Sequence, residues 1–66
     1  MRLTEFTELL TGEFGQLSAD SILSDHVLIA VGGRTGAQAI ADGVDPKEIW
    51  EAICRDFDVP VARWYP

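Results

Sequence analysis

Apolar residues at the start of the chain recur at the spacing of a helix. They stand at steps of three and four residues, at Leu3, Phe6, Leu10 and Phe14. This spacing places them on one face and predicts an amphipathic helix. Thr4 is a candidate N-cap, and Gly15 is a suitable end because glycine tolerates the conformation that follows a helix. Gly12 lies inside this segment, where it costs about 1 kcal/mol relative to alanine.

The next segment, SADSILSDHVLIAVGG, also carries a wide apolar stripe. Ser18 can cap a helix there, and Gly32-Gly33 can end it. The run HVLIAV is also rich in the β-branched residues that favour strands. The sequence offers no second strand to pair with that run, and an unpaired strand is not stable. We therefore expect a helix that begins after Ser18 and ends at Gly32.

Two further helices are expected in the second half of the chain. Thr35 and Gln38 have the spacing of a capping box, at the start of a short helix that Gly43 ends. Asp45 and Pro46 then give the strongest start signal, an N-cap followed by proline at the first helical position. Five apolar side chains follow on one face of this fourth helix, namely Ile49, Trp50, Ile53, Cys54 and Phe57.

These segments predict an all-α fold, a compact bundle of about four short helices with short connections. Sixty-six residues make one small domain, residues 1–66, and Pro60 sets off residues 58–66 as a C-terminal tail or an extra turn. The third and fourth helices are joined through Gly43-Val44-Asp45 and have the form of a helix-turn-helix corner.

Charge narrows the classes of partner. Eleven carboxylates against five basic residues give a net charge of −6. This balance disfavours nonspecific binding to nucleic acid and to anionic membranes, because both begin with attraction to negative charge. No apolar stretch approaches the roughly 20 residues that span a bilayer, and the first residues lack the apolar run of a signal peptide. We therefore expect a cytoplasmic protein without membrane association.

The helix-turn-helix corner has two interpretations. In a DNA-binding version the first residues of the second helix face the major groove, and here those residues are Lys47, Glu48 and Glu51. One lysine and two glutamates suit phosphates poorly, and Lys47–Glu51 and Glu51–Arg55 have the spacing of solvated ion pairs on a helix. The sequence favours a packing corner. The alternative is a nucleic-acid binder, as a homodimer, in which Lys47 and Arg55 contact the backbone.

No catalytic constellation emerges from the remaining reactive side chains. His26 is the only histidine, and a lone histidine beside Asp25 favours a hydrogen-bonded structural role over a zinc site. Cys54 lies among apolar helix positions, as a small buried hydrophobe does. Arg34, in GGRTG, can donate to the carbonyl end of the second helix or to a partner carboxylate. We expect no metal, no cofactor and no enzymatic activity.

Trp64 and Tyr65 lie near the end of the chain, where they either cover the core or stay accessible to a partner. A domain so short of core favours the first arrangement. Aromatic residues and arginine are nevertheless enriched at interaction hot spots. We therefore combine the acidic face of the fourth helix with the loop arginine and the tail into one candidate interaction surface. Its residues are Arg34, Lys47, Glu48, Glu51, Arg55 and Trp64.

Several ordered blocks resemble one protein family. They are MRLTEF, DHVL, GGRT, GVDPKEIW, and the cysteine that precedes DVP. Over nearly the whole chain except ARWYP, the sequence resembles the short actinobacterial proteins grouped as domain of unknown function 3046. In that family a tryptophan commonly follows LTEF, where this chain has Thr7. The resemblance implies no activity and no site residues. Genes of the family often lie near recombination genes, which keeps a nucleic-acid-linked role open.

The sequence therefore predicts a non-enzymatic protein-interaction module. A partner with a basic groove would be attracted to it electrostatically. The alternative is a helix-turn-helix protein that binds nucleic acid or regulates recombination.

Overall fold

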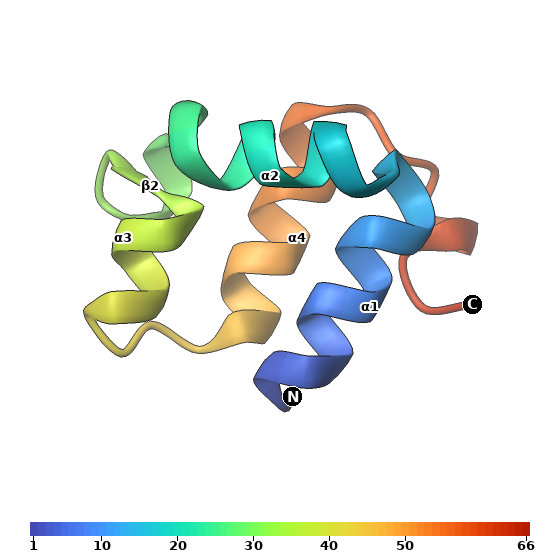
Figure 1. Cartoon of the computed structure of the whole chain (residues 1–66), viewed down its shortest axis with the longest axis horizontal. Helices are drawn as coiled ribbons and strands as arrows, with labels where there is room; N and C mark the ends of the chain where they lie inside the picture. The colour runs from blue at the N-terminus through green and yellow to red at the C-terminus, as the bar shows by residue number, and fades with distance from the viewer.

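The computed structural model describes residues 1–66 and contains four α-helices and one two-stranded sheet. Figure 1 shows α4 lying between α1 and α3, with α2 crossing over them. The helices are α1 (Leu3–Phe14), α2 (Gln16–Asp25), α3 (Gly36–Ala41) and α4 (Pro46–Asp56). The strands are β1 (Val27–Leu28) and β2 (Arg34–Thr35), and two 3-10 turns are η1 (Ile29–Val31) and η2 (Val61–Arg63).

The core is built around α4, as its apolar spacing predicts. The side chains of this helix that are withdrawn from water are Ile49, Trp50, Ala52, Ile53 and Cys54. Phe6 and Leu10 of α1 and Leu28 of β1 pack against them and are also buried. Phe57 remains 40% exposed, so it lies at the edge of the core. Burying side chains of this size stabilises the fold by about 1.5–3 kcal/mol each.

The prediction of a second helix that continues to Gly32 is wrong beyond Asp25. α2 begins at Gln16, before Ser18, and ends at Asp25, and the following run HVLIAV divides into β1 and η1. β1 pairs antiparallel with β2, in the register Val27↔Thr35. The partner strand is only two residues long, which is why the sequence did not reveal it. The fold is therefore mostly helical and not strictly all-α.

Glycines make the reversal between the two strands possible. Gly32 and Gly33 have φ values of 80° and 71°, in the left-handed region that glycine adopts at little cost. Gly32 N–H donates to the carbonyl of Ile29, and Gly33 N–H donates to the carbonyl of Leu28. The chain thus turns back within a few residues and places β2 directly before α3.

The predicted starts of α3 and α4 are confirmed. Thr35 Oγ1 accepts from the Gln38 N–H at 3.2 Å, and the Gln38 side chain accepts from the Thr35 N–H at 3.0 Å, which completes the capping box. Asp45 Oδ1 accepts from the Lys47 N–H at 3.0 Å, with Pro46 at the first helical position. These bonds satisfy donors that a helix start leaves free.

The first helix begins one residue earlier than its predicted cap. α1 starts at Leu3, so Thr4 lies within the first turn and Arg2 occupies the capping position. Glu5 accepts from the Arg2 N–H at 3.3 Å. A carboxylate in the first turn also meets the positive end of the helix dipole, which stabilises the start in place of a Thr4 cap.

The corner between α3 and α4 is tightly closed. Gly43 has a φ of 84°, and the Val44 N–H donates to the carbonyl of Ala39 at 3.0 Å. Ala39 is fully buried, and half-buried Val44 packs against the core between the two helices.

None of the helices has the length and apolar character required to cross a membrane.

Candidate functional site

The C-terminal segment, residues 59–66, folds back over the core. The Trp50 indole N–H donates to the carbonyl of Trp64 at 2.8 Å, and the Trp64 indole N–H donates to the carbonyl of Val59 at 2.8 Å. Trp50 is fully buried beneath the segment, so its indole N–H depends on this carbonyl for a hydrogen-bond partner in place of water. The fold-back that the small core favours is confirmed for Trp64, which packs against the core, whereas Tyr65 remains 48% exposed.

An ion pair joins this segment to α1. Arg63 of η2 donates to both carboxylate oxygens of Glu13, from Nε at 3.3 Å and from Nη2 at 3.1 Å. This two-pronged geometry orients a guanidinium more firmly than a single contact does. The two residues are fifty positions apart in the sequence, so the pair places the C-terminal segment beside the end of the first helix.

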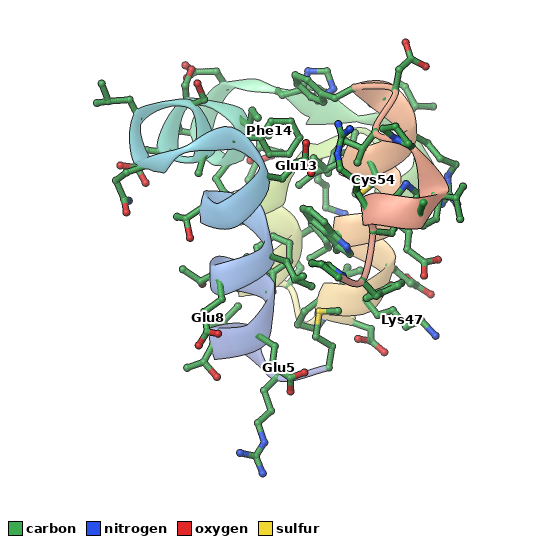
Figure 2. All side chains as sticks on the ribbon, turned by 90° about the vertical axis from the view of Figure 1, so that its right-hand side faces the viewer. Glu5, Glu8, Glu13, Phe14, Lys47 and Cys54 are labelled. Atoms are coloured by element: carbon green, nitrogen blue, oxygen red, sulfur yellow. The ribbon has the colours of Figure 1, made fainter.

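A cleft of about 590 Å³ opens between α1 and the C-terminal segment, and we call it the α1 cleft. Figure 2 shows Glu5, Glu8 and Glu13 along α1, with the C-terminal segment opposite its upper part. The volume of the α1 cleft is in the range of about 300–1,000 Å³ that is common for binding pockets. The cleft is lined by Glu5, Glu8, Leu9, Gly12, Glu13, Ala62, Arg63 and Pro66.

The rim of the α1 cleft is negative. Its lining contains three carboxylates, those of Glu5, Glu8 and Glu13, and one guanidinium, that of Arg63. This guanidinium is already paired with Glu13. The Glu8 carboxylate forms no hydrogen bond or ion pair within the chain, and Glu5 accepts only from the Arg2 backbone. Both side chains therefore keep acceptor capacity for a donor from outside. The apolar residues of the lining are Leu9, Ala62 and Pro66, and we call them the apolar floor.

Gly12 gives the α1 cleft an open stretch of helix backbone. A methyl group added at this position would meet nothing within 4 Å. The reversal from α1 to α2 relies on Gly15, which has a φ of 81°, whereas Gly12 keeps ordinary helical geometry. The fold of the free chain therefore has no need of glycine at position 12, although glycine inside a helix costs about 1 kcal/mol relative to alanine.

The six residues of the candidate interaction surface do not form one surface. Arg34 lies on β2, at the opposite end of the molecule from the C-terminus in Figure 1. There it donates to Asp42 Oδ2 at 3.2 Å. The sequence left two acceptors open for this arginine, the carbonyl end of the second helix and a carboxylate. The structure shows a carboxylate, which belongs to the same chain. Lys47 and Glu48 are exposed in the first turn of α4.

Glu51, Arg55 and Trp64 do come together, through the C-terminal segment. Tyr65 donates its hydroxyl to the Glu51 carboxylate at 2.6 Å, and the Arg55 guanidinium lies 5.9 Å from the centre of the Trp64 ring. The ion pairs expected from the spacing of Lys47, Glu51 and Arg55 are not formed. Glu51 and Arg55 instead contact the C-terminal segment, whereas Lys47 remains exposed, and the sequence spacing within one helix could not reveal these contacts.

His26 has the hydrogen-bonded structural role that the sequence favours. Its Nε2 lies 2.9 Å from Asp56 Oδ2, and its ring meets the edge of Phe57 with centres 4.7 Å apart. These contacts tie the end of α2 to the end of α4. Across the whole chain, no group of three or more histidine, cysteine, aspartate or glutamate side chains lies close enough to hold a metal ion.

The two groups with perturbed acidity are both held neutral at ordinary pH. Burial, followed by the negative charges of Glu13 and Glu51, raises the pKa of the Cys54 thiol to about 11, with Arg55 acting in the opposite direction. Burial, followed by the hydrogen bond to Glu51, raises the pKa of Tyr65 to about 12. A fully buried, protonated thiol is a poor nucleophile. Cys54 is thus a core residue.

Sequence reasoning overlooked the α1 cleft. One signal was present, because Glu5, Glu8 and Gly12 recur at helical spacing on the polar side of the first helix. Its second wall comes from residues about fifty positions later, and nothing in the local sequence links Arg63 to Glu13. The cleft could therefore be recognised only once the fold was known.

Fold and site define a small, mostly helical domain with an acidic cleft and a buried thiol. Within this class the chain belongs to the family described as "Protein of unknown function (DUF3046)", whose sequence model matches residues 1–62. The family resemblance drawn from the sequence blocks is confirmed.

One curated relative extends the comparison to a longer protein. A segment of 36 residues is 58% identical to part of the "Putative envelope-preserving system protein Rv2742c" of Mycobacterium tuberculosis. The match covers 54% of this chain but only 13% of the length of that protein. No solved structure matches the chain.

Proposed function

We propose that this chain is a non-enzymatic protein-interaction module that binds a basic protein partner. The observation that supports this function is the α1 cleft, in which free carboxylates border an apolar floor. Apolar contact supplies affinity, and charged rims supply orientation and partner choice. The reactive side chains support a role without catalysis, since Cys54 is buried and protonated and His26 is engaged by Asp56.

The charge of the whole chain supports the same partner class. At −6, the molecule attracts a basic surface over a distance of about 8 Å, the screening length at physiological salt. The similarity to a short part of a much longer mycobacterial protein fits a module that also occurs within larger chains. On this proposal, association with the partner weakens as salt rises.

The proposed function is tested by an affinity-tagged pull-down from the native host, with each sample divided and one half treated with nuclease. We expect a protein partner that survives the nuclease and is lost from the Glu5→Gln/Glu8→Gln variant. The Glu48→Gln/Asp58→Asn variant removes the same charge outside the α1 cleft and should retain the partner. Loss from this variant alone would place the docking surface toward the α4 face inferred from the sequence, which includes Glu48. Loss of every partner after nuclease would contradict the proposal.

A helix-turn-helix nucleic-acid binder is the second candidate, and the tight corner between α3 and α4 favours it. Lys47 is exposed at the start of α4, where such proteins contact DNA. Against it, Arg55 lies over Trp64 and Arg34 is paired with Asp42. Titration of duplex DNA at about 50 mM salt, where phosphate attraction is strong, tests this function. Binding that weakens steeply with salt would support it.

A further inference from the structure

Gly12 is the residue of the α1 cleft that the free chain does not explain. It is exposed, it lies inside a helix, and a methyl group there would touch nothing. The other glycines at turns differ from it, because Gly15 and Gly43 have positive φ values that side chains disfavour. Glycine also permits another backbone to approach closely. Gly12 is the position on α1 where such an approach is open.

From this we infer that the α1 cleft receives a peptide segment of the partner that carries lysine or arginine next to an apolar side chain, and that this segment lies against the α1 backbone at Gly12. The inference rests on the proposed function and adds the chemistry and position of what is bound. Gly12 lines the same cleft as the two free carboxylates, so one segment can meet both.

The three parts of the α1 cleft match three parts of such a segment. Glu5 and Glu8 offer carboxylate oxygens to ammonium or guanidinium groups, which form the strongest class of hydrogen bond. The apolar floor, Leu9 with Ala62 and Pro66, takes the apolar side chain. The methyl-free surface at Gly12 lets the main chain of the segment approach.

Other ligands fit the α1 cleft less well. Phosphate groups of nucleic acids or lipids would be repelled by Glu5, Glu8 and Glu13, and Arg63 is already occupied by the last of these. A cation without apolar groups would leave the floor unused. Charge complementarity and the mixed lining together therefore select a basic peptide that also has apolar side chains.

The variant Gly12→Ala separates binding from folding. Alanine favours a helix over glycine, so we expect the melting temperature to rise by about 4–8 °C, as a gain near 1 kcal/mol gives in a domain of this size. A peptide lying against the backbone would collide with the new methyl group. We therefore expect affinity for the partner to fall by about tenfold or more. A raised melting temperature with unchanged affinity would overturn the inference.

Short synthetic peptides supply a probe whose chemistry is known. The uniformly ¹⁵N-labelled chain is titrated with a lysine–leucine peptide and, as the matched control, with a lysine–serine peptide of the same length and charge. We expect changes in amide chemical shift concentrated at residues 5–13 and 62–65, and weaker binding of the lysine–serine peptide. Equal binding of both peptides, or shifts centred on α4, would overturn the inference.

Charge-matched variants complete the test. Glu5→Gln/Glu8→Gln should weaken the lysine–leucine peptide by about tenfold or more, whereas Glu48→Gln/Asp58→Asn removes the same charge outside the α1 cleft and should change affinity little. If the pull-down yields a partner that Glu5→Gln/Glu8→Gln loses but Gly12→Ala keeps, the proposed function stands and the peptide placement fails. If no protein partner survives nuclease, the proposed function itself fails.

Discussion

Cys54 shows how burial decides the role of a residue in this small chain. The side chain lies in the fourth helix between apolar neighbours and is fully withdrawn from water. Placing a thiolate there would cost its hydration, and the carboxylates of Glu13 and Glu51 oppose the negative charge as well. The sequence indicated a buried cysteine from its spacing alone, because positions 49, 50, 53 and 54 share one helical face.

The raised pKa of Cys54 predicts a loss of stability at alkaline pH. In the unfolded chain the thiol ionises near its usual value of 9.0, whereas in the folded chain it ionises near 11. Between these values the folded state holds a proton that the unfolded state has released. The free energy of unfolding therefore falls as pH rises from about 9 to about 11, and the contribution is fully present below about 9.

Urea denaturation over this pH range, compared with the variant Cys54→Ala, measures the effect. Replacing the buried thiol by hydrogen lowers stability at every pH, but it also removes this titration. We expect the difference in unfolding free energy between the two proteins to shrink as pH rises through the window. Tyr65 is present in both proteins, and the burial and the hydrogen bond to Glu51 that raise its pKa most act in both. A difference that stays constant with pH would contradict the prediction.

At the scale of elements, the chain was predictable where its signals were local. α4 carries its cap, its proline and its apolar face within about a dozen residues, and the structure reproduces them. The prediction failed after Asp25 because Val27–Val31 has the apolar spacing of a helix. The strand that pairs with Val27–Leu28, Arg34–Thr35, is too short to be recognised from the sequence. Pairing between such short strands depends on the turn that joins them, not on their own composition.

The hairpin predicts a specific sensitivity at Gly33. Its φ of 71° is unfavourable for any residue with a side chain, yet a methyl group there would meet no other atom. The variant Gly33→Ala should therefore lose about 1–2 kcal/mol of unfolding free energy from backbone strain alone. Gly33→Asn should lose less, because asparagine tolerates this conformation better. Urea denaturation measures both, and a Gly33→Ala variant as stable as the original chain would contradict the prediction.

At the scale of the whole molecule, the two ends of the chain make the site together. The C-terminal segment closes the core over Trp50 and forms one wall of the α1 cleft. The ion pair between Glu13 and Arg63 holds α1 and the C-terminal segment, the two walls of the cleft, next to each other, although the two residues are fifty positions apart in the sequence. An exposed ion pair contributes little to stability, about 0–1 kcal/mol, so its main effect is to position the segment. Stability and the binding surface therefore share the same few contacts.

Because stability and the binding surface depend on the same contacts, removing the Trp64 side chain should affect both. The side chain is half-buried and packed on the core, and its indole N–H donates to the carbonyl of Val59 within the C-terminal segment. We expect Trp64→Ala to lower the unfolding free energy by about 2–3 kcal/mol, somewhat less than for a fully buried aromatic. A domain of this length has only about 3–10 kcal/mol in total. Urea denaturation followed by circular dichroism measures the loss.

Trp64→Ala also leaves Trp50 as the only tryptophan, so its fluorescence reports directly on the cover that the segment provides. We expect the emission of the folded variant to shift to longer wavelength as water reaches the Trp50 ring, together with weaker binding at the α1 cleft. Tyr65→Phe is the control, because it removes only the hydrogen bond to Glu51 and should cost about 0.5–1.5 kcal/mol without moving the emission. An emission maximum typical of a buried indole in Trp64→Ala would mean that the core closes without the segment. The cleft would then be an addition to an already complete domain, and its loss would affect binding alone.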